Sequence, residues 1–291
     1  MTPNPPAWRS LLYVPVTRQD FVAKAHTRGA DAIQLDLEDA VAPAEKAAAR
    51  EALPAAVETV TAHGVDVVVR INRPWRLAVR DLEAAVRPGV RALALPKVPN
   101  ADHVRACAEI VAELEAERGM PARSVGFIAM VETAGALLDM RAIAAAHPRV
   151  LALTLGAEDF ATDIGIAPEP DLLAAPKQAV VLAARAAGVL PLGLVGTVAH
   201  YADTDAFAAT VERSRRIGFV GASAIHPSQV PLLNAGFTPP AEAVAHAERL
   251  VAAYEDAHAR GLGAIEFEGS MIDEPVAERA RNLLAAARRI G

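Results

Sequence analysis

The sequence contains one cysteine and few aromatic residues, and each shortage excludes a class of protein. Because Cys107 is the only cysteine, the chain can form neither an intramolecular disulfide nor a cysteine-based zinc cluster. We expect Cys107 to be a small buried residue of a helix. Aromatic residues make up only 4% of the 291 residues, and the apolar content consists mainly of Ala, Val and Leu. This composition favours helices packed closely on a sheet over an aromatic-rich β-sandwich.

Basic charge and long hydrophobic runs are also lacking. The chain has 35 acidic and 29 basic side chains, a net charge of −6, whereas a nucleic-acid-binding surface normally needs a basic footprint. No apolar run approaches the ~20 residues of a membrane span, and the start MTPNPPAWRS lacks the hydrophobic stretch of a signal peptide. We therefore expect a cytoplasmic protein with no nucleic-acid or membrane partner.

Short apolar segments of β type alternate with Ala-rich segments of helical spacing. The predicted strands are Leu11–Val14, Ala32–Leu35, Asp66–Ile71, Ala92–Leu95, Val125–Val131, Val150–Leu155, Val189–Val195 and Ala222–Ile225. The clearest predicted helices are Asp20–Arg28, Ala44–Thr61, Ala101–Arg118 and Asp203–Ile217. Continuous apolar strands are typical of a parallel sheet covered by helices. Eight such units over about 225 residues predict a (β/α)8 TIM barrel rather than an open doubly wound sheet.

The pattern changes in the last sixty or so residues, a length below that of most independent domains. A long amphipathic helix is predicted at 239–260, followed by a Gly-rich turn at 261–263, an extended segment at 265–275 and a second helix at 276–290. We expect this tail to lack a core of its own. The predicted organisation is a barrel domain at 1–232 and a C-terminal helical lid at 233–291, which packs on the barrel or on a neighbouring subunit.

Polar side chains follow most of the predicted strands, where a barrel of this kind carries its chemistry. They are Asp36, Glu38, Asp39, Arg70, Asn72, Lys97, Glu132, Glu158, Asp159 and His226. Any one of them could be a helix cap or part of a rim salt bridge. Together they predict an active site at the carboxyl ends of the strands.

Glu132 and Asp159 follow consecutive strands, which lie roughly 5 Å apart in a sheet. Two carboxylates at that separation repel each other unless one is protonated or a cation lies between them. Mg²⁺ is held in this way, with water and substrate oxygens filling its other positions, and Mn²⁺ is an alternative. Without paired His or Cys ligands, zinc is disfavoured. The structural alternative is that Asp159 only caps the following helix.

Several sequence blocks, taken in order, resemble a known family. RSLLYVPVTRQDFVAKA, GADAIQLDLEDAVAP, VRIN, LPKV, MVETAGALL, LGAEDFATDIG and GFVGASAIHPSQV resemble the citrate lyase β-subunit-like CoA-ester lyases of the HpcH/HpaI aldolase superfamily. The resemblance extends over nearly the whole chain. It implies a Mg²⁺-dependent carbon–carbon lyase that cleaves or forms a 3-hydroxyacyl-CoA thioester. The products of cleavage would be acetyl-CoA or propionyl-CoA and a 2-keto acid.

The resemblance also implies roles for individual residues. Glu132 and Asp159 match the Mg²⁺ ligands, and Arg70 matches an arginine that contacts substrate and would stabilise the enolate. Asp36, Glu38 and Asp39 would support Arg70 and the metal-bound waters, with Asp36 and Glu38 counted among the catalytic residues. The positions implied to contact CoA, the substrate carboxylate or the pocket wall are Tyr13, Val14, Lys24, Gly156, Ala157, Glu158, Ile225 and His226.

The tail segment GSMIDEP resembles the lid of malyl- and citramalyl-CoA lyases, in which an aspartate reaches the neighbouring subunit's site. Asp273 would then transfer the proton at the enolate carbon, and the protein would be a homo-oligomer, either a trimer or a hexamer. From the residues alone, Asp273 is equally well explained as a helix N-cap before Pro275.

Two other functions are left open by the sequence. Water could attack the CoA thioester at the same site, giving a thioesterase or a malate-synthase-like enzyme. The chain could also be a non-catalytic subunit of a citrate lyase-like complex. Val16 stands where the family commonly has glycine, and Ala222 and Ser223 stand where a Gly-Lys pair is frequent. These departures leave the acyl-CoA and the keto acid unassigned.

Overall fold

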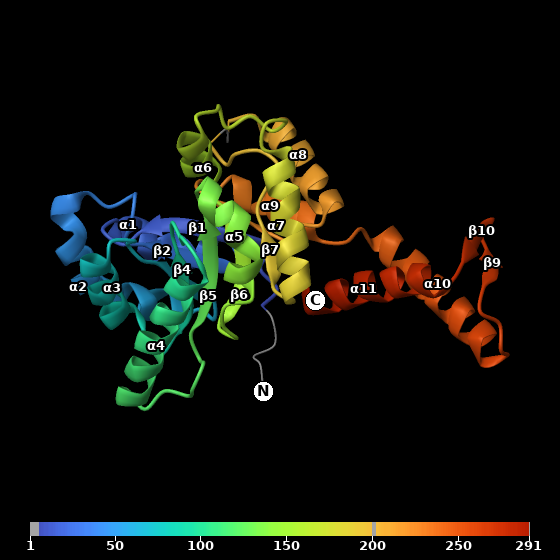
Figure 1. The fold of residues 1–291 in the computed structure, drawn as a ribbon, viewed down its shortest axis with the longest axis horizontal. Coiled ribbons are helices and arrows are strands. Elements are labelled where there is room, and N and C mark those ends of the chain that lie inside the picture. The colour runs from blue at the N-terminus through green and yellow to red at the C-terminus, as the bar shows by residue number, and fades with distance from the viewer. Residues whose placement is uncertain (1–5, 200–201, 291) are drawn as a thin grey trace. The chain divides into compact units, whose positions relative to one another are not determined.

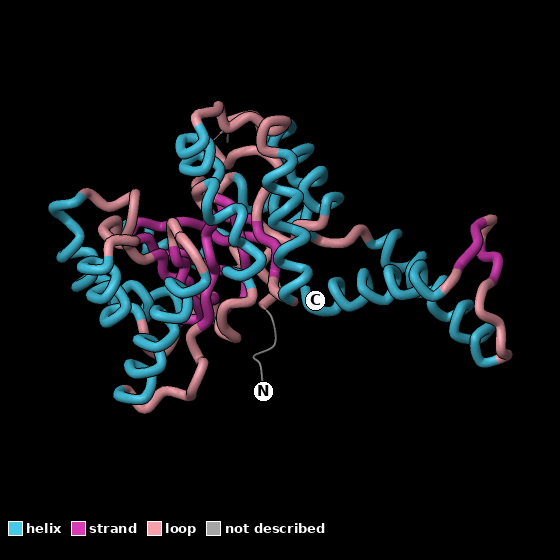
Figure 2. Tube along the Cα trace, viewed as in Figure 1, coloured by secondary structure: helices cyan, strands magenta, loops and turns pink. Residues whose placement is uncertain are grey.

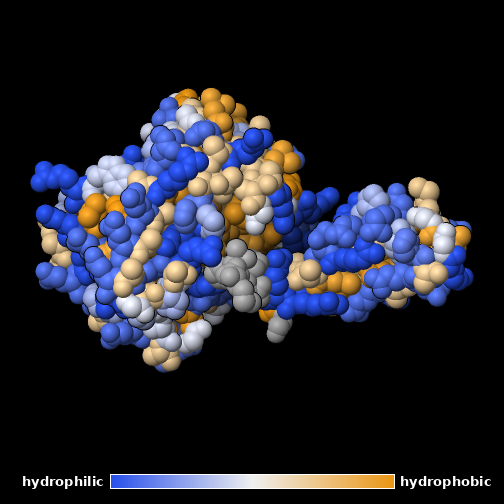
Figure 3. Space-filling view, turned by 60° about the horizontal axis from the view of Figure 1, so that its bottom comes forward, coloured by the Kyte–Doolittle hydropathy of each residue, from blue (hydrophilic) through white to orange (hydrophobic). Residues whose placement is uncertain are grey.

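The computed structural model describes residues 6–199 and 202–290. The chain divides into two compact units, Met1–Phe237 and Thr238–Gly291, which are described separately below. In the first unit the strands gather at the centre and helices surround them (Figure 2). On the face seen in Figure 3, most of the surface is hydrophilic, and hydrophobic side chains form small groups. No helix within the described ranges is both long and apolar enough to cross a membrane.

Eight parallel strands form a nearly closed barrel in the first unit, in the order β7-β6-β5-β4-β3-β2-β1-β8. The two ends of this order, β7 and β8, meet at a bridge between Leu192 and Gly221. There the Gly193 N–H donates to the Gly221 carbonyl at 2.8 Å. The predicted TIM barrel is therefore confirmed. The strands are β1 (Ser10–Pro15), β2 (Ala32–Asp36), β3 (Asp66–Arg70), β4 (Val90–Leu95), β5 (Gly126–Val131), β6 (Val150–Leu155), β7 (Leu190–Leu192) and β8 (Ala222–Ala224).

The seventh strand is shorter than the prediction of Val189–Val195. Pro191 lies in its middle and has no N–H to donate to a neighbouring strand. Gly193 follows with a φ of +147°, which takes the chain out of strand geometry. The barrel is thus weakest on the side where β7 approaches β8.

Helices surround the barrel in the order expected of strand–helix repeats (Figure 1). They are α1 (Gln19–Ala25), α2 (Lys46–Thr61), α3 (Trp75–Ala85), α4 (Ala101–Glu117), α5 (Ala134–Ala144), α6 (Ala157–Ile164), α7 (Ala174–Ala187), α8 (Thr204–Ile217) and α9 (Gln229–Phe237). The four clearest predicted helices are present, although 26–28 and 43–45 form 3-10 turns. Side chains of Asn100, Thr133 and Asp203 cap α4, α5 and α8.

Side chains point alternately to the two faces of each strand, and the buried ones form two layers of core. One side of each strand packs under the helices, where Cys107 is fully buried as predicted. The other side fills the barrel with a mixture of small and large residues, including Ala32, Val68 and Ile128. Arg70 lies two residues beyond Val68, on the same face of β3. The period of two therefore turns the polar ends of the strands toward the barrel axis.

The second unit consists of two helices and a hairpin. The helices α10 (Ala241–Ala259) and α11 (Glu274–Ile290) lie side by side, and the antiparallel strands β9 (Ile265–Phe267) and β10 (Ser270–Ile272) connect them (Figure 1). The extended segment predicted at 265–275 is thus a hairpin, and α11 begins two residues earlier than expected. The expected absence of a core is wrong, because Leu250, Tyr254 and Ile272 are part of a buried apolar cluster within this unit.

Candidate active site

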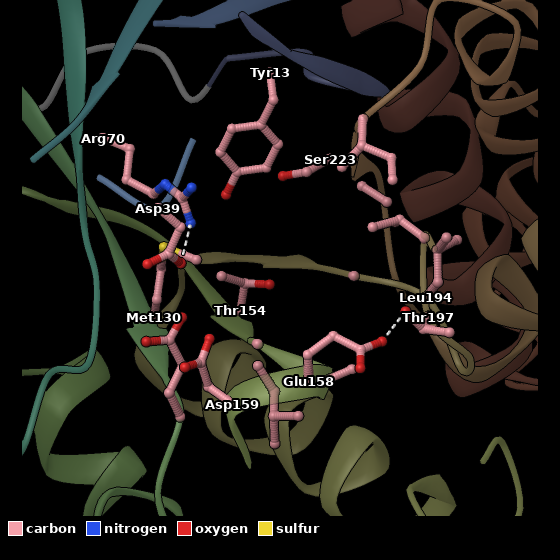
Figure 4. A pocket seen from close by; sticks show the side chains of 18 of the residues that line it. Tyr13, Asp39, Arg70, Met130, Thr154, Glu158, Asp159, Leu194, Thr197 and Ser223 are labelled. Atoms are coloured by element: carbon pink, nitrogen blue, oxygen red, sulfur yellow. Dashed lines mark hydrogen bonds and ion pairs between the residues drawn. The ribbon is translucent and has the colours of Figure 1, made fainter. Parts of the chain in front are cut away.

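A cavity of about 520 Å³ opens at the carboxyl ends of the barrel strands. Figure 4 shows side chains from several strands pointing into it. Five carboxyl groups line the cavity, and the two basic side chains in its wall are Arg70 and Lys177. The carboxyl groups belong to Asp36, Asp39, Glu132, Glu158 and Asp159. Acidic groups therefore outnumber basic groups in the cavity wall, an arrangement that favours a cation over an anion.

Arg70, at the end of β3, is held by the acidic turn that follows β2. Its Nε and Nη2 donate to the two carboxylate oxygens of Asp36 at 2.8 and 2.7 Å. Its Nη1 forms ion pairs with Glu38 at 2.9 Å and with Asp39 at 3.5 Å (Figure 4 shows the pair with Asp39). Bidentate pairing fixes the plane of a guanidinium as well as its position. Arg70 is therefore a rigid positive charge at the cavity wall.

Local sequence explains why the acidic turn is well defined. The Asp36 carboxylate accepts the N–H groups of Glu38 at 2.9 Å and of Ala40 at 3.1 Å. Lys46 from α2 donates to the carbonyls of Leu37 and Glu38 at 2.8 and 2.6 Å. Asp36 thus orders its own turn and holds Arg70 with the same two oxygens.

Tyr13 of β1 lies beside Arg70 in the same wall. The Arg70 guanidinium carbon is 4.6 Å from the centre of the Tyr13 ring. Burial raises the pKa of the Tyr13 hydroxyl to about 12, and the nearby Arg70 charge only partly offsets this effect. The hydroxyl is therefore a neutral hydrogen-bonding group at physiological pH.

Glu132, after β5, is almost fully buried and lies against the backbone of the neighbouring strand end. A Cβ atom built on Gly156 would lie 2.6 Å from Glu132 Oε1, so only glycine leaves room for this carboxyl group. Glu132 Oε2 accepts the backbone N–H of Lys97 at 2.7 Å. Burial, followed by the negative charges of Asp159 and Glu38, raises the pKa of Glu132 to about 8.

The first turn of α6 supplies Glu158 and Asp159 to the cavity wall. Glu158 Oε1 accepts the Thr197 hydroxyl at 2.5 Å, and Asp159 Oδ1 is 3.5 Å from Lys97 Nζ (Figure 4 shows the Glu158–Thr197 bond). The Gly156 N–H is already donated to the Val131 carbonyl at 3.0 Å. Of the backbone groups expected to receive a substrate carboxylate, the N–H groups of Ala157 and Glu158 therefore remain, at a helix N-terminus.

The donor set fits a hard divalent cation. Burial, and after it the charge of Asp159, raises the pKa of Glu132 and so makes its negative charge costly, and a cation between the two carboxylates would relieve that cost. In the described residues no three or more His, Cys, Asp or Glu side chains are arranged to hold a metal. Glu132 and Asp159 thus suit an ion that takes its other ligands from water and substrate, as Mg²⁺ does.

Some predicted site residues lie away from the cavity wall. Val14 points to the other side of β1 and packs in the core beneath the helices. Lys24 is exposed on α1, and the exposed His226 contacts Ser228 at 2.7 Å while its neighbour Ile225 lines the cavity. Asp273 belongs to the second unit, where its carboxylate accepts the Val276 N–H at 3.3 Å and caps α11.

The sequence placed Lys97 on the rim without giving it a role, and it missed Lys177. Lys97 follows β4 in the same pattern as the other rim residues. Lys177 lies inside α7, where nothing in the sequence distinguishes it. Its fully buried Nζ donates to the Leu155 carbonyl at 2.9 Å, and burial lowers its pKa to about 8. Only the fold brings this residue to the cavity.

An α/β barrel with charged side chains around a cavity at the carboxyl ends of its strands has the architecture of a barrel enzyme. The chain belongs to the HpcH/HpaI aldolase/citrate lyase family, which it matches over residues 9–227. The family resemblance inferred from the sequence blocks is therefore confirmed.

Relatives and a solved structure extend this similarity over the whole chain. The chain is 34% identical over 315 residues to an L-malyl-CoA/β-methylmalyl-CoA lyase of Cereibacter sphaeroides, covering 100% of this chain and 98% of the relative. It is 35% identical over 288 residues to a (3S)-malyl-CoA thioesterase of the same species, covering 97% and 95%. The crystal structure of CitE from Mycobacterium tuberculosis with magnesium, acetoacetate and coenzyme A superposes with a TM-score of 0.75 at 32% identity, covering 97% and 98%.

Proposed function

We propose that the protein is a Mg²⁺-dependent carbon–carbon lyase acting on a 3-hydroxyacyl-CoA that bears a carboxylate beside its hydroxyl carbon. Its products are acetyl-CoA or propionyl-CoA and a 2-keto acid, and the reverse condensation uses the same site. The observation that carries the proposal is the rigid Arg70 charge facing the same cavity as Glu132 and Asp159. The relative named a malyl-CoA lyase supports the substrate class.

Glu132 and Asp159 would hold the cation, which when bound supplies Lewis acidity to the hydroxyl and carboxylate oxygens of the substrate. The backbone N–H groups of Ala157 and Glu158 would orient that carboxylate. Arg70 would stabilise the negative charge that develops on the thioester oxygen as the enolate departs. Because Asp36 and Glu38 fix the guanidinium beforehand, little reorganisation is needed during the reaction.

Asp273 is proposed to transfer the proton at the enolate carbon from a neighbouring subunit, with segment 233–291 serving as the lid. An aspartate carboxylate can accept or return a proton when it lies within hydrogen-bond reach of the reacting carbon. Binding of the CoA chain is proposed along the side of the cavity that includes Tyr13, with Lys24 and His226 meeting its outer parts.

The test is to incubate the purified chain with malyl-, citramalyl-, methylmalyl- and citryl-CoA, with Mg²⁺ and with EDTA. A lyase releases a 2-keto acid and an acyl-CoA, both measurable by chromatography. We expect cleavage of at least one ester that depends on Mg²⁺ and is lost in Glu132→Gln, which keeps the shape of the side chain but not its charge.

Hydrolysis of the thioester is the second candidate, favoured by the similarity to a malyl-CoA thioesterase. Its product is free CoA thiol without an acyl-CoA, so the same assay distinguishes the two reactions. Absence of any turnover by the chain alone, with metal binding intact, would instead favour a non-catalytic subunit that needs a partner.

A further inference from the structure

Lys97 lies between the acidic turn after β2 and the two carboxylates proposed to hold the metal. Its Nζ is 2.7 Å from Glu38 Oε1, 3.6 Å from Asp39 Oδ1 and 3.5 Å from Asp159 Oδ1. Its backbone N–H donates to Glu132 Oε2 at 2.7 Å. One residue therefore contacts both proposed metal ligands and the turn that fixes Arg70.

The backbone of Lys97 is held in an unusual conformation. Its φ is +49°, in the left-handed region that residues with a side chain rarely adopt. Such conformations persist where the surroundings fix them, and they are frequent at functional sites. Here the bond to Glu132 and the ion pairs of the side chain fix the residue from both ends.

The ammonium group of Lys97 lies among three carboxylates, which favour its charged form. All three carboxylate oxygens, from Glu38, Asp39 and Asp159, lie within 3.6 Å of Nζ. The side chain is 33% exposed, and a lysine has a flexible four-carbon stem. The ammonium is thus a partly exposed cation within the carboxylate cluster.

We propose that Lys97 is the resident counter-charge of this cluster, neutralising Glu38, Asp39 and Asp159 in the metal-free protein and competing with the divalent cation for Asp159. Lys97 is then a positioning residue that sets the affinity for metal and keeps the carboxylates in place before metal binds. The inference rests on the proposed function only in assuming that a divalent cation binds at Glu132 and Asp159.

The test measures Mn²⁺ binding to the purified protein without substrate, by electron paramagnetic resonance of free Mn²⁺. Lys97→Met removes the charge and keeps an unbranched side chain, whereas Lys97→Arg keeps the charge. Removing one positive charge close to a divalent ion should tighten binding roughly tenfold or more in Lys97→Met. Lys97→Arg should bind as the wild type does.

Thermal unfolding provides a readout that does not depend on activity. In EDTA, Lys97→Met should unfold at a lower temperature than the wild type, because Glu38, Asp39 and Asp159 lose a counter-charge. Adding Mn²⁺ should raise its unfolding temperature by more than that of the wild type. Arg70 still pairs with Glu38 in the variant, which keeps the acidic turn folded.

Unchanged or weaker Mn²⁺ binding in Lys97→Met, with wild-type binding intact, would overturn the proposal. A wild type that binds no Mn²⁺ would overturn it together with the metal dependence of the proposed function. If the wild type and Lys97→Met bind Mn²⁺ as expected but the wild type cleaves no CoA ester, the proposed function fails and the role of Lys97 stands.

Discussion

At the scale of single residues, the arginine of β3 shows how burial and pairing convert a common side chain into a fixed charge. Arg70 uses its Nε and Nη2 on Asp36 and its Nη1 on Glu38. Lysine could supply the charge at this place but not the forked geometry. Arg70, Asp36 and Glu38 together therefore determine how the guanidinium group is oriented at the cavity wall.

We predict that Arg70→Lys lowers kcat about 100-fold or more with a smaller change in KM, as expected for loss of a group that stabilises charge in the transition state. Arg70→Ala should lower kcat further, but it leaves Asp36 without its cation and Glu38 with Lys97 alone, and so also lowers stability. Steady-state kinetics on the best CoA ester, together with unfolding temperatures, check both expectations. An unchanged kcat in Arg70→Lys would contradict the role.

The buried lysine of α7 leads to a prediction about pH. The pKa of Lys177 is lowered by burial from its ordinary value of 10.5 to about 8. Between these two values the unfolded chain binds more protons than the folded one, so this group's contribution to stability improves as pH rises through that range. Below about pH 8 the folded protein carries the full cost of the buried charge.

Lys177→Met removes this titration. The free energy of unfolding of the variant, relative to that of the wild type, should be most favourable at about pH 7. This difference in unfolding free energy should shrink by up to about 3 kcal/mol toward pH 10, at ~1.4 kcal/mol per pKa unit. Urea unfolding at both pH values measures it. A difference that does not depend on pH would mean that Lys177 titrates normally in the folded protein.

At the scale of elements, the junction of β6 and α6 is where backbone geometry and site chemistry meet. Gly156 leaves space for the Glu132 carboxyl group, and the next residues begin the helix that carries Asp159. Glu132, just after β5, and the start of α6 can thus lie close together because residue 156 has no side chain.

Gly156→Ala should displace Glu132, because the added Cβ would lie 2.6 Å from its Oε1 and 2.7 Å from its Cγ. We expect the variant to bind Mg²⁺ at least about tenfold more weakly, which corresponds to a loss of ~1.4 kcal/mol in binding free energy. Its activity should be lower for the same reason. Gly135→Ala in α5 is the matched control, since its Cβ would meet nothing within 4 Å. Similar Mg²⁺ titrations for the two variants would refute the packing argument.

At the scale of the whole molecule, the assignment of Asp273 requires more than one chain. Mixing Asp273→Ala with Arg70→Ala should restore activity in hybrids, because some sites would combine an intact Arg70 with an intact Asp273. Activity is measured after the two variants are unfolded and refolded together, with each refolded alone as control. If the mixed samples are no more active than the separate ones, the site is not shared between subunits. Equilibrium sedimentation of the wild type would test the trimer or hexamer directly.

The sequence by itself determined the barrel, because strand and helix periods are local and eight repeats leave few arrangements. It also determined the acidic rim, since Asp36 and Glu132 follow predicted strands and Arg70 lies near the end of one. The tertiary structure alone decided which of these groups pair. Asp36 binds Arg70 across 34 residues, and Lys177 reaches the cavity from the first turn of α7. Such contacts depend on strand register and helix packing, which set distances between residues remote in sequence and which no local pattern encodes.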